Sequence, residues 1–263
     1  ARNVISGNGT PDTELDEFNN VVTLNFGNGV YITGADVTGN RIIGNYIGTD
    51  AAGTAAVGNA FSGVVIRSGA NGNFIGGDGE GEGNVIAGNG DPTDGCPDNC
   101  GNGMSNFYGN GVYLLGGTTQ DNVVQGNLVG IGSDDGTLRN VSSGIRLDGT
   151  PENLIGGTTD GAGNRIKGHS NNVFLSVGIA LVAVDDVRVE GNFSSGNSTG
   201  ISIFNSTGCT IGSPGAGNVF SSNTSGVSID TGSDHVFQGN FIGTDESGTS
   251  GAGNGHSGLY IGG

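Results

Sequence analysis

Basic side chains are scarce in this sequence of 263 residues. Eight Lys and Arg stand against 25 Asp and Glu, which gives a formal net charge of −17 at pH 7. Binding to nucleic acid or to an anionic lipid surface requires clustered Lys and Arg. The charge therefore opposes both kinds of partner, and it favours solubility and, where acids converge, cations.

Long apolar runs and helical periodicity are also missing. No run of about 18 apolar residues exists that could span a membrane, and every window with apolar spacing of three and four is interrupted by Gly. Apolar residues recur instead at every second position and are followed by Gly or Asn. This pattern predicts short strands that end in turns, and hence an all-β protein.

Glycine is abundant, with 57 residues, but it follows no Gly-X-Y period, so a collagen-like fold is excluded. The periodic Ile and Val argue against a disordered Gly-rich chain. The length lies within the range of one all-β domain, and we predict a single domain over residues 1–263.

Cysteine is rare, with three residues. Cys96 and Cys100 lie close together in the loop CPDNC, and we predict a local disulfide between them over the alternative of two free thiols. Such a bridge suits an extracellular protein. Cys209 stands alone between turn residues.

Two short phrases alternate through the sequence, which identifies one repeated structural unit. The first is apolar-x-Gly-Asn with small variations, as in Val124–Asn127. The second is Gly-apolar-x-apolar, which starts at Gly29, Gly63, Gly111, Gly144, Gly178, Gly200, Gly226 and Gly258. The shortest spacing, the 22 residues from Gly178 to Gly200, suffices for three short strands and three turns. A lone coil cannot bury its apolar residues, whereas stacked coils can, so we predict a solenoid of about eight coils.

The Asn that ends the first phrase is expected to point inward and to bond backbone groups of adjacent coils. We predict one Asn ladder at one turn, built from Asn8, Asn45, Asn89, Asn127, Asn192, Asn223 and Asn240. His169 occupies the same place in its repeat. Insertions 9–28, 90–110 and 170–177 all precede a Gly-apolar phrase, so we expect them on one side of the solenoid.

The segment NRIIGNYIGTDAAGTAAVGN (40–59), with GVVI and GNVIAGN after it, resembles the right-handed parallel β-helix repeats of bacterial secreted and cell-surface proteins. The resemblance covers essentially the whole chain. It implies a right-handed parallel β-helix located outside the cell, on a fold used by adhesins, surface-layer and stalk-like proteins as well as by polysaccharide lyases and hydrolases. We expect an extracellular structural or adhesive module rather than an enzyme, with a carbohydrate-active enzyme or glycan binder as the alternative.

Two constellations bear on that alternative. Arg165, Lys167 and His169 with Asp185–Asp186 are similar to the catalytic set of polygalacturonases, but the order differs and no NTD motif occurs, so we predict no catalytic residues. The outward column of the Gly-apolar strands contains Tyr31, Tyr113 and Arg146 as glycan-binding candidates. Tyr is also an ordinary strand residue, which explains the column without a ligand.

Asp91, Asp94 and Asp98 are the candidate calcium ligands. They lie around DGCPDNC, a stretch similar to thrombospondin type 3 calcium repeats, and Ca²⁺ accepts irregular oxygen cages. A solvated acidic loop is the alternative.

The two chain ends each hold part of a coil. ARNVISGN contains Val4 and Ile5, and GLYIGG contains Leu259 and Ile261; together they have fourteen residues, against fifteen from Gly178 to Asn192. We therefore predict that copies stack head to tail, either as separate chains or as tandem segments of one longer chain, with no nucleic-acid or membrane partner and with polysaccharide as a further possible partner.

Overall fold

The computed structural model describes residues 2–9, 13–15, 21–23, 27–90, 109–169 and 176–263. The described residues contain three long sheets of parallel strands and one short antiparallel pair, β2 (Thr13–Leu15) with β3 (Val21–Thr23). No helix occurs among them, so none of the described segments could cross a membrane as a helix.

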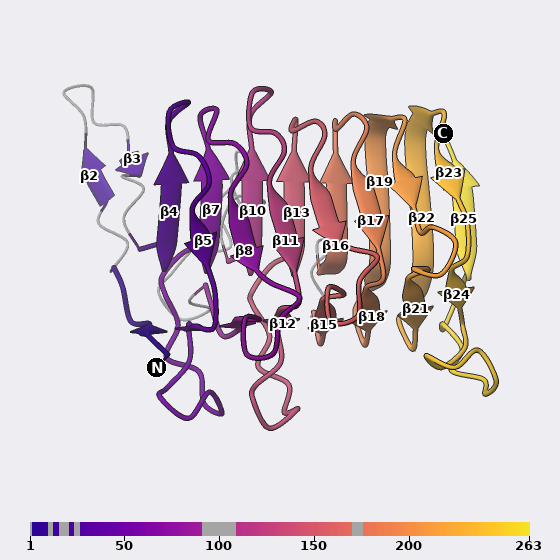
Figure 1. Ribbon diagram of the computed structural model, residues 1–263, viewed down its shortest axis with the longest axis horizontal. Coiled ribbons are helices and arrows are strands. Elements are labelled where there is room, and N and C mark those ends of the chain that lie inside the picture. The colour runs from indigo at the N-terminus through magenta and orange to yellow at the C-terminus, as the bar shows by residue number, and fades with distance from the viewer. Residues whose placement is uncertain (1, 10–12, 16–20, 24–26, 91–108, 170–175) are drawn as a thin grey trace.

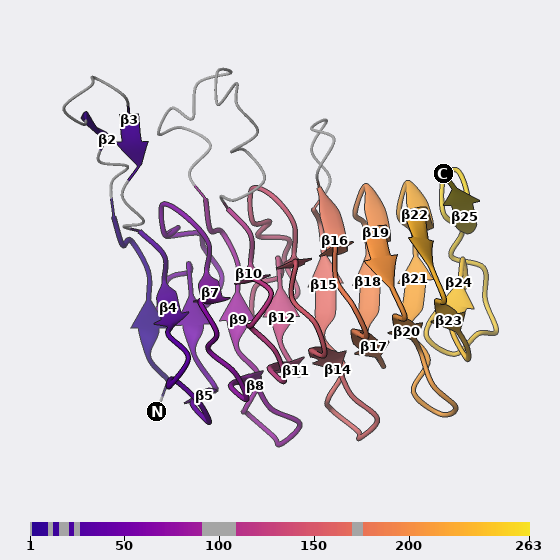
Figure 2. The same cartoon turned by 90° about the horizontal axis from the view of Figure 1, so that it is seen from above.

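The chain visits the three sheets in a fixed order, and we number them in that order (Figures 1 and 2). Sheet 1 holds β4 (Val30–Thr33), β7 (Val64–Arg67), β10 (Val112–Leu115), β13 (Ile145–Asp148), β16 (Val177–Val182), β19 (Thr199–Thr207), β22 (Ser225–Ser233) and β25 (Leu259–Gly262). Sheet 2 holds β5 (Arg41–Ile42), β8 (Phe74–Gly76), β11 (Val123–Gln125), β14 (Leu154–Gly156), β17 (Arg188–Glu190), β20 (Thr210–Ile211) and β23 (Val236–Phe237). Sheet 3 holds β1 (Val4–Ile5), β6 (Tyr46–Ile47), β9 (Val85–Ile86), β12 (Leu128–Val129), β15 (Arg165–Lys167), β18 (Phe193–Ser195), β21 (Val219–Ser221) and β24 (Phe241–Ile242).

One passage through sheets 1, 2 and 3 is one coil, and each strand pairs in parallel with its equivalent in the next coil. We number the coils by their sheet 1 strands, from coil 1 (β4) to coil 8 (β25), and β1 precedes coil 1. The crossover connection between two parallel strands of one sheet is right-handed in nearly all proteins. The protein is thus a right-handed parallel β-helix, as the sequence predicted.

The period-two pattern explains the core. In β7, for example, Val64 and Ile66 pair with Val112 and Leu114 of the next coil, and all four are fully buried. Residues at alternate positions point to opposite faces of a strand, so each sheet supplies an inward column that stacks along the solenoid.

The glycine that opens each sheet 1 strand permits close packing of the coils. A Cβ added to Gly144 would lie 2.7 Å from the carbonyl oxygen of Gly178 and 2.5 Å from a methyl carbon of Ile166. No side chain fits there, which explains why this glycine begins every Gly-apolar phrase.

Three rows of excursions leave the coils. We call the turns from sheet 1 to 2, from 2 to 3 and from 3 to 1 the first, second and third turn. Arms at 48–57, 130–138 and 243–252 follow sheet 3 strands of coils 1, 3 and 7, and loops at 77–83, 157–163 and 212–217 precede the second turn of coils 2, 4 and 6 (Figures 1 and 2).

The predicted insertions share the third turn, where their described ends lie. For the insertion 90–110, the next coil bonds to both ends: Val141 N–H donates to Asn89 O (2.9 Å) and Ser142 N–H donates to Gly109 O (2.8 Å). The prediction that these insertions leave one side of the solenoid is confirmed.

Candidate functional site

Buried amide side chains form columns at three turns, not at one. The second-turn column consists of Asn3, Asn45, Asn84, Asn127, Asn164, Asn192, Asn218 and Asn240. The third-turn column consists of Asn8, Asn59, Asn89, Asn140, His169, Asn197, Asn223 and Asn254. The first-turn column holds Asn40, Asn73, Asn122 and Asn153.

The prediction of a single turn is therefore wrong. Asn8, Asn89 and Asn223 belong to the third turn, whereas the other four predicted members belong to the second. The phrase apolar-x-Gly-Asn closes a strand at both turns, so the sequence pattern alone cannot distinguish them. Intervening members such as Asn84 and Asn164 follow loops and lack the phrase.

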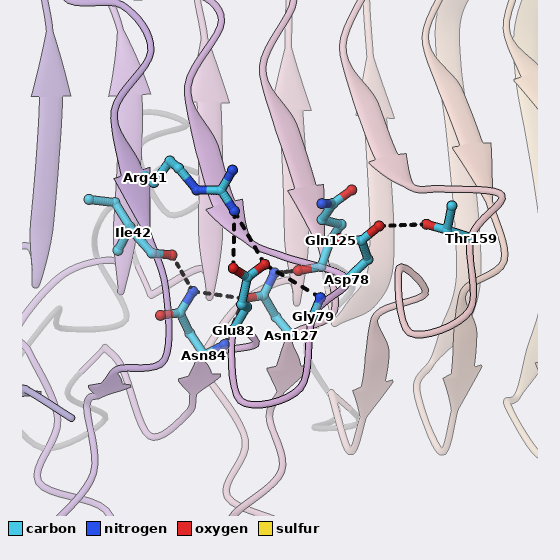
Figure 3. Close-up of polar contacts among 9 residues, drawn as sticks. All are labelled: Arg41, Ile42, Asp78, Gly79, Glu82, Asn84, Gln125, Asn127 and Thr159. Carbon is cyan, nitrogen blue, oxygen red and sulfur yellow. Dashed lines mark hydrogen bonds and ion pairs between the residues drawn. The ribbon is translucent and has the colours of Figure 1, made fainter. Parts of the chain in front are cut away.

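Asn127 shows how one member is held (Figure 3). Its Nδ2 donates to the carbonyl oxygens of Ile75 (2.8 Å) and Gln125 (2.9 Å) and to Asn164 Oδ1 (2.9 Å). Its Oδ1 accepts from the backbone N–H and the Nδ2 of Asn84. Each amide thus satisfies buried backbone groups that bend away from the sheet ladder.

His169 replaces an asparagine in the third-turn column. Its Nδ1 lies 3.2 Å from Asn197 Oδ1, and its Nε2 lies 3.3 Å from Asn140 Nδ2. The two neighbours fix the tautomer, because the Nδ1–H must donate and Nε2 must accept. Burial lowers the pKa of His169 to about 4, so the imidazole is neutral at pH 7.

The first-turn column ends where the residue type changes. In the next three coils, the positions equivalent to Asn153 are occupied by Val187, Cys209 and His235. The backbone hydrogen bonds show this equivalence, because the N–H of the residue after each position donates to the carbonyl of the equivalent residue one coil earlier. Val187 and Cys209 are fully buried. Burial raises the pKa of the Cys209 thiol to about 11, so this cysteine is a protonated core residue.

The three glycan-binding candidates do not share one exposed surface. Tyr31 is 42% exposed, but Tyr113 is 3% and Arg146 is 7% exposed. Arg146 Nη2 bonds Asp148 at 3.0 Å on the same strand. All three lie in the predicted outward column, but alternation along a strand says which side a residue faces and not how exposed it is, so Tyr113 and Arg146 are buried there.

The aspartates of the arms serve their own turns. Asp50 Oδ1 accepts from the N–H of Thr54 (2.8 Å) and Ala55 (3.1 Å), and these bonds lower its pKa. Asp245 is held in the same way by the N–H groups of Thr249 and Ser250. Turn geometry therefore accounts for the repeated Asp without a metal.

Excursions of one row contact each other across an intervening coil that has no excursion of that row. In the loop row, Thr159 Oγ1 donates to Asp78 Oδ2 at 2.9 Å (Figure 3). In the arm row, Ser133 N–H donates to Gly53 O at 2.8 Å. These contacts tie alternate coils together outside the sheets.

Residues compared with the polygalacturonase set lie at different places. Arg165 and Lys167 are on β15 of sheet 3, while Asp185 and Asp186 lie at the first turn of coil 5. His169 is enclosed in its column. Among the described residues, these groups do not come together in one site, so the absence of catalytic residues stays a prediction.

The predicted calcium ligands Asp91, Asp94 and Asp98, and the predicted disulfide of Cys96 with Cys100, lie outside the described residues. Within the described part of the chain, no three His, Cys, Asp or Glu side chains gather where they could hold a metal ion. Both assignments remain predictions.

The predicted join of the two end segments needs a correction. It assumed that Asn8 is equivalent to Asn192, but Asn8 lies at the third turn and Asn3 at the second. The end segments together supply a sheet 1 strand, β25, and a sheet 3 strand, β1, but no sheet 2 strand. The match in length therefore does not amount to a complete coil.

Comparison with known proteins agrees with this architecture. A family model described as "Periplasmic copper-binding protein (NosD)" matches residues 82–261, well over half of the sequence. The chain belongs to the NosD family. This membership fits three stacked parallel sheets with Asn columns. No curated protein matches the chain.

The NosD description names copper, so the donors need to be examined. Copper in proteins takes imidazole, thiolate and thioether ligands. Of the described donors, Cys209 is buried and protonated, and both ring nitrogens of His169 are engaged in the column. His235 Nδ1 accepts from the Cys209 N–H at 3.3 Å. His235 Nε2 has no hydrogen-bond partner and His256 is exposed, but no three His, Cys, Asp or Glu side chains gather among the described residues. The described residues therefore do not fit a copper site, and the remaining sulfur donors, Cys96, Cys100 and Met104, lie outside them.

Proposed function

We propose that the protein is a structural β-helix of the cell envelope, located outside the cytoplasm, that associates end to end with further copies of itself as an adhesive or fibre-forming module. The observation that carries the proposal is the exposed apolar face of the last coil that the structure describes. Leu259 and Ile261 of β25 are 44% and 69% exposed, whereas their equivalents one coil earlier, Val227 and Ile229, are 0% and 5% exposed.

Covering this coil would be strongly favourable. A fully buried Leu or Ile contributes about 1.5–3 kcal/mol relative to an exposed one. The outer edge of β25 also presents backbone N–H and C=O groups that no strand pairs, and such an edge is a template for another strand. At the opposite end, Val4 and Tyr31 are 47% and 42% exposed.

The two ends have complementary steps. Sheet 1 extends one strand beyond the others at the last coil, through β25, and sheet 3 extends one strand beyond the others at the first coil, through β1. A second copy stacked on the last coil would place its β4 beside β25 and its β1 beside β24. Sheets 1 and 3 would then be continuous, with one strand missing in sheet 2. A heterologous contact of this kind does not close, so it generates a filament.

The net charge makes the predicted association depend on salt concentration. Copies that each carry −17 repel one another, and salt screens this repulsion, with a Debye length of about 8 Å at 0.15 M. We therefore expect size-exclusion chromatography with light scattering to show larger species as protein and salt concentration increase. Ile261→Lys should abolish them, since it places a charge in the contact.

Phe204→Lys is the matched control, because Phe204 is 50% exposed on coil 6, between coils 5 and 7 and away from both ends. It should associate like the parent. If the parent stays a monodisperse monomer at high protein and salt concentration, or if both variants behave alike, end-to-end association is refuted.

A further inference from the structure

Exposed apolar side chains are confined to the terminal coils with one exception. Among the described residues, the exposed large apolar side chains are Val4, Tyr31, Ile43, Val57, Phe204, Val236, Phe241, Leu259, Tyr260 and Ile261. All except Phe204 belong to the segment before coil 1, to coil 1 itself, or to coils 7 and 8. They lie in the first and last coils that the structure describes, where fewer described coils surround them.

Phe204 has a covering coil on both sides. It lies on β19 in coil 6, paired with Val182 of coil 5 and Asp230 of coil 7, and yet it is 50% exposed. Alternation along β19 buries Ile203 and directs Phe204 to the outer face of sheet 1. An exposed aromatic ring on a sheet face between two covering coils is a feature that packing of the coils does not require.

Polar groups that can bond hydroxyls surround this ring. Ser202 and Ser228 occupy the adjacent outward column, followed by Tyr260, which is 50% exposed. Ser228 Oγ donates to Asp230 Oδ2 at 2.9 Å and holds the carboxylate on the face.

The backbone beside Phe204 is in an unfavourable conformation. Ala183, Asn205 and Thr231 follow directly after Val182, Phe204 and Asp230, and they have φ of 50°, 49° and 61°. The equivalent positions in coils 1 to 4 are Gly34, Ser68, Gly116 and Gly149, also with positive φ. Left-handed backbone is unfavourable for Ala and more so for β-branched Thr, and such strain concentrates at functional sites.

The strained residues also supply polar groups. Asn205 N–H donates to Thr231 Oγ1 at 3.1 Å, and Thr231 Oγ1 donates to the Asp230 carbonyl at 2.6 Å. The Asn205 side chain is exposed and carries both a donor and an acceptor. Glycine at these positions would relieve the strain and would remove the side chains.

The chemistry of this face selects a class of ligand. An aromatic ring with hydroxyl, amide and carboxylate groups around it suits a sugar ring, whose C–H face packs on the aromatic and whose hydroxyls bond the polar groups. The guanidinium of Arg146 on the same sheet is buried and bound to Asp148, while Asp230 is partly exposed, so a polyanion is disfavoured. The backbone groups of β19 are paired on both sides, so an added peptide strand finds no free edge here.

We propose that the outer face of sheet 1 over β19, β22 and β25 binds a neutral linear polysaccharide that runs along the solenoid axis. Phe204 and Tyr260 are the stacking residues; they are two coils apart, about 10 Å along the axis, and two residues apart along their strands. Asp230 and Asn205 are the hydrogen-bonding residues. This site replaces the predicted set of Tyr31, Tyr113 and Arg146 on the same sheet, and it does not depend on association through the ends.

Titration of the ¹⁵N-labelled protein with cellohexaose and chitohexaose, two neutral linear oligosaccharides, tests the proposal. We expect amide shifts that saturate at millimolar ligand and that centre on Phe204 and Asp230. Phe204→Ala should weaken binding at least tenfold, and Val57→Ala, which removes an equally exposed apolar side chain elsewhere, should not change it. Phe204 is exposed, so both variants should fold, which far-ultraviolet circular dichroism checks.

Three results would overturn the proposal: no binding of either neutral sugar, equal affinity of Phe204→Ala and the parent, or binding only of oligogalacturonate. Shifts at Phe204 caused by hexalysine but by neither sugar would assign the face to a basic peptide instead. Each result is read on the monomer at low protein concentration, so it is independent of the test for end-to-end stacking.

Discussion

Removal of one amide from the second-turn column should have a large and calculable effect on stability. Asn127→Ala deletes the partner of three buried backbone groups: the carbonyls of Ile75 and Gln125 and the N–H of Asn84. A buried polar group left without a partner costs about 1–3 kcal/mol. With three such groups, we expect the free energy of unfolding to fall by about 3 kcal/mol, since water that enters the vacated space offsets part of the loss.

Urea unfolding followed by circular dichroism measures this change as a shift of the midpoint at constant slope. Asn40→Ala is the control, because Asn40 is exposed at the start of the first-turn column and donates from its side chain to Asn73 Oδ1 and to Thr38 O. We expect it to change stability by less than about 1 kcal/mol. An Asn127→Ala protein that unfolds at the same urea concentration as Asn40→Ala would refute the role assigned to the column.

Three further predictions concern buried groups. The pKa of His169 is about 4 in the folded protein against an ordinary value of 6.5, so the free energy of unfolding is full above pH 6.5 and falls by about 3 kcal/mol as the pH drops toward 4. His169→Asn should remove this pH dependence. Equal acid sensitivity of the two proteins in urea titrations would contradict the buried neutral imidazole. Gly144→Ala should destabilise the protein by more than about 3 kcal/mol in thermal melts, because its Cβ would overlap the next coil. Gly149→Ala should cost only about 1 kcal/mol, because the space around its Cβ is open and only its φ of 64° is unfavourable. Similar melting temperatures of the two variants would exclude the close approach of Gly144 to the next coil. Cys209 should resist a thiol reagent in the native protein and react after denaturation, and rapid native labelling at this residue would show that it is not buried.

The fold could be predicted from the sequence because one local pattern recurs many times. Residues such as Val64 and Ile66 alternate with outward positions, and Gly144 marks the entry to a strand, so each repeat confirms the others. The turns could not be assigned because Asn89 and Asn127 end identical phrases at different corners of the coil. Only pairing between coils separates them, and pairing is not a local property of the sequence.

The glycan-binding candidates show what alternation along a strand can predict and what it cannot. Tyr31, Tyr113 and Arg146 face outward by alternation, as expected, but two of them are buried. Phe204 lies one pleat further along its strand, outside the column that was considered. The signal that could have indicated it is the run of Ala183, Asn205 and Thr231 at a turn position where glycine occurs in coils 1, 3 and 4.

The alternation of excursions has a consequence for how such a protein can lengthen its loops. A hairpin or loop with its side chains is about 10 Å wide, whereas neighbouring coils are about 4.8 Å apart. An arm or a loop therefore occupies the space of two coils, and the next coil must lack an excursion of the same row. Arms on coils 1, 3 and 7 and loops on coils 2, 4 and 6 follow this parity. An arm grafted on coil 4 would collide with the arm of coil 3, whereas an arm grafted on coil 5 must leave room for Glu246 of the coil 7 arm, which pairs with Arg165 of β15 at 2.8 Å.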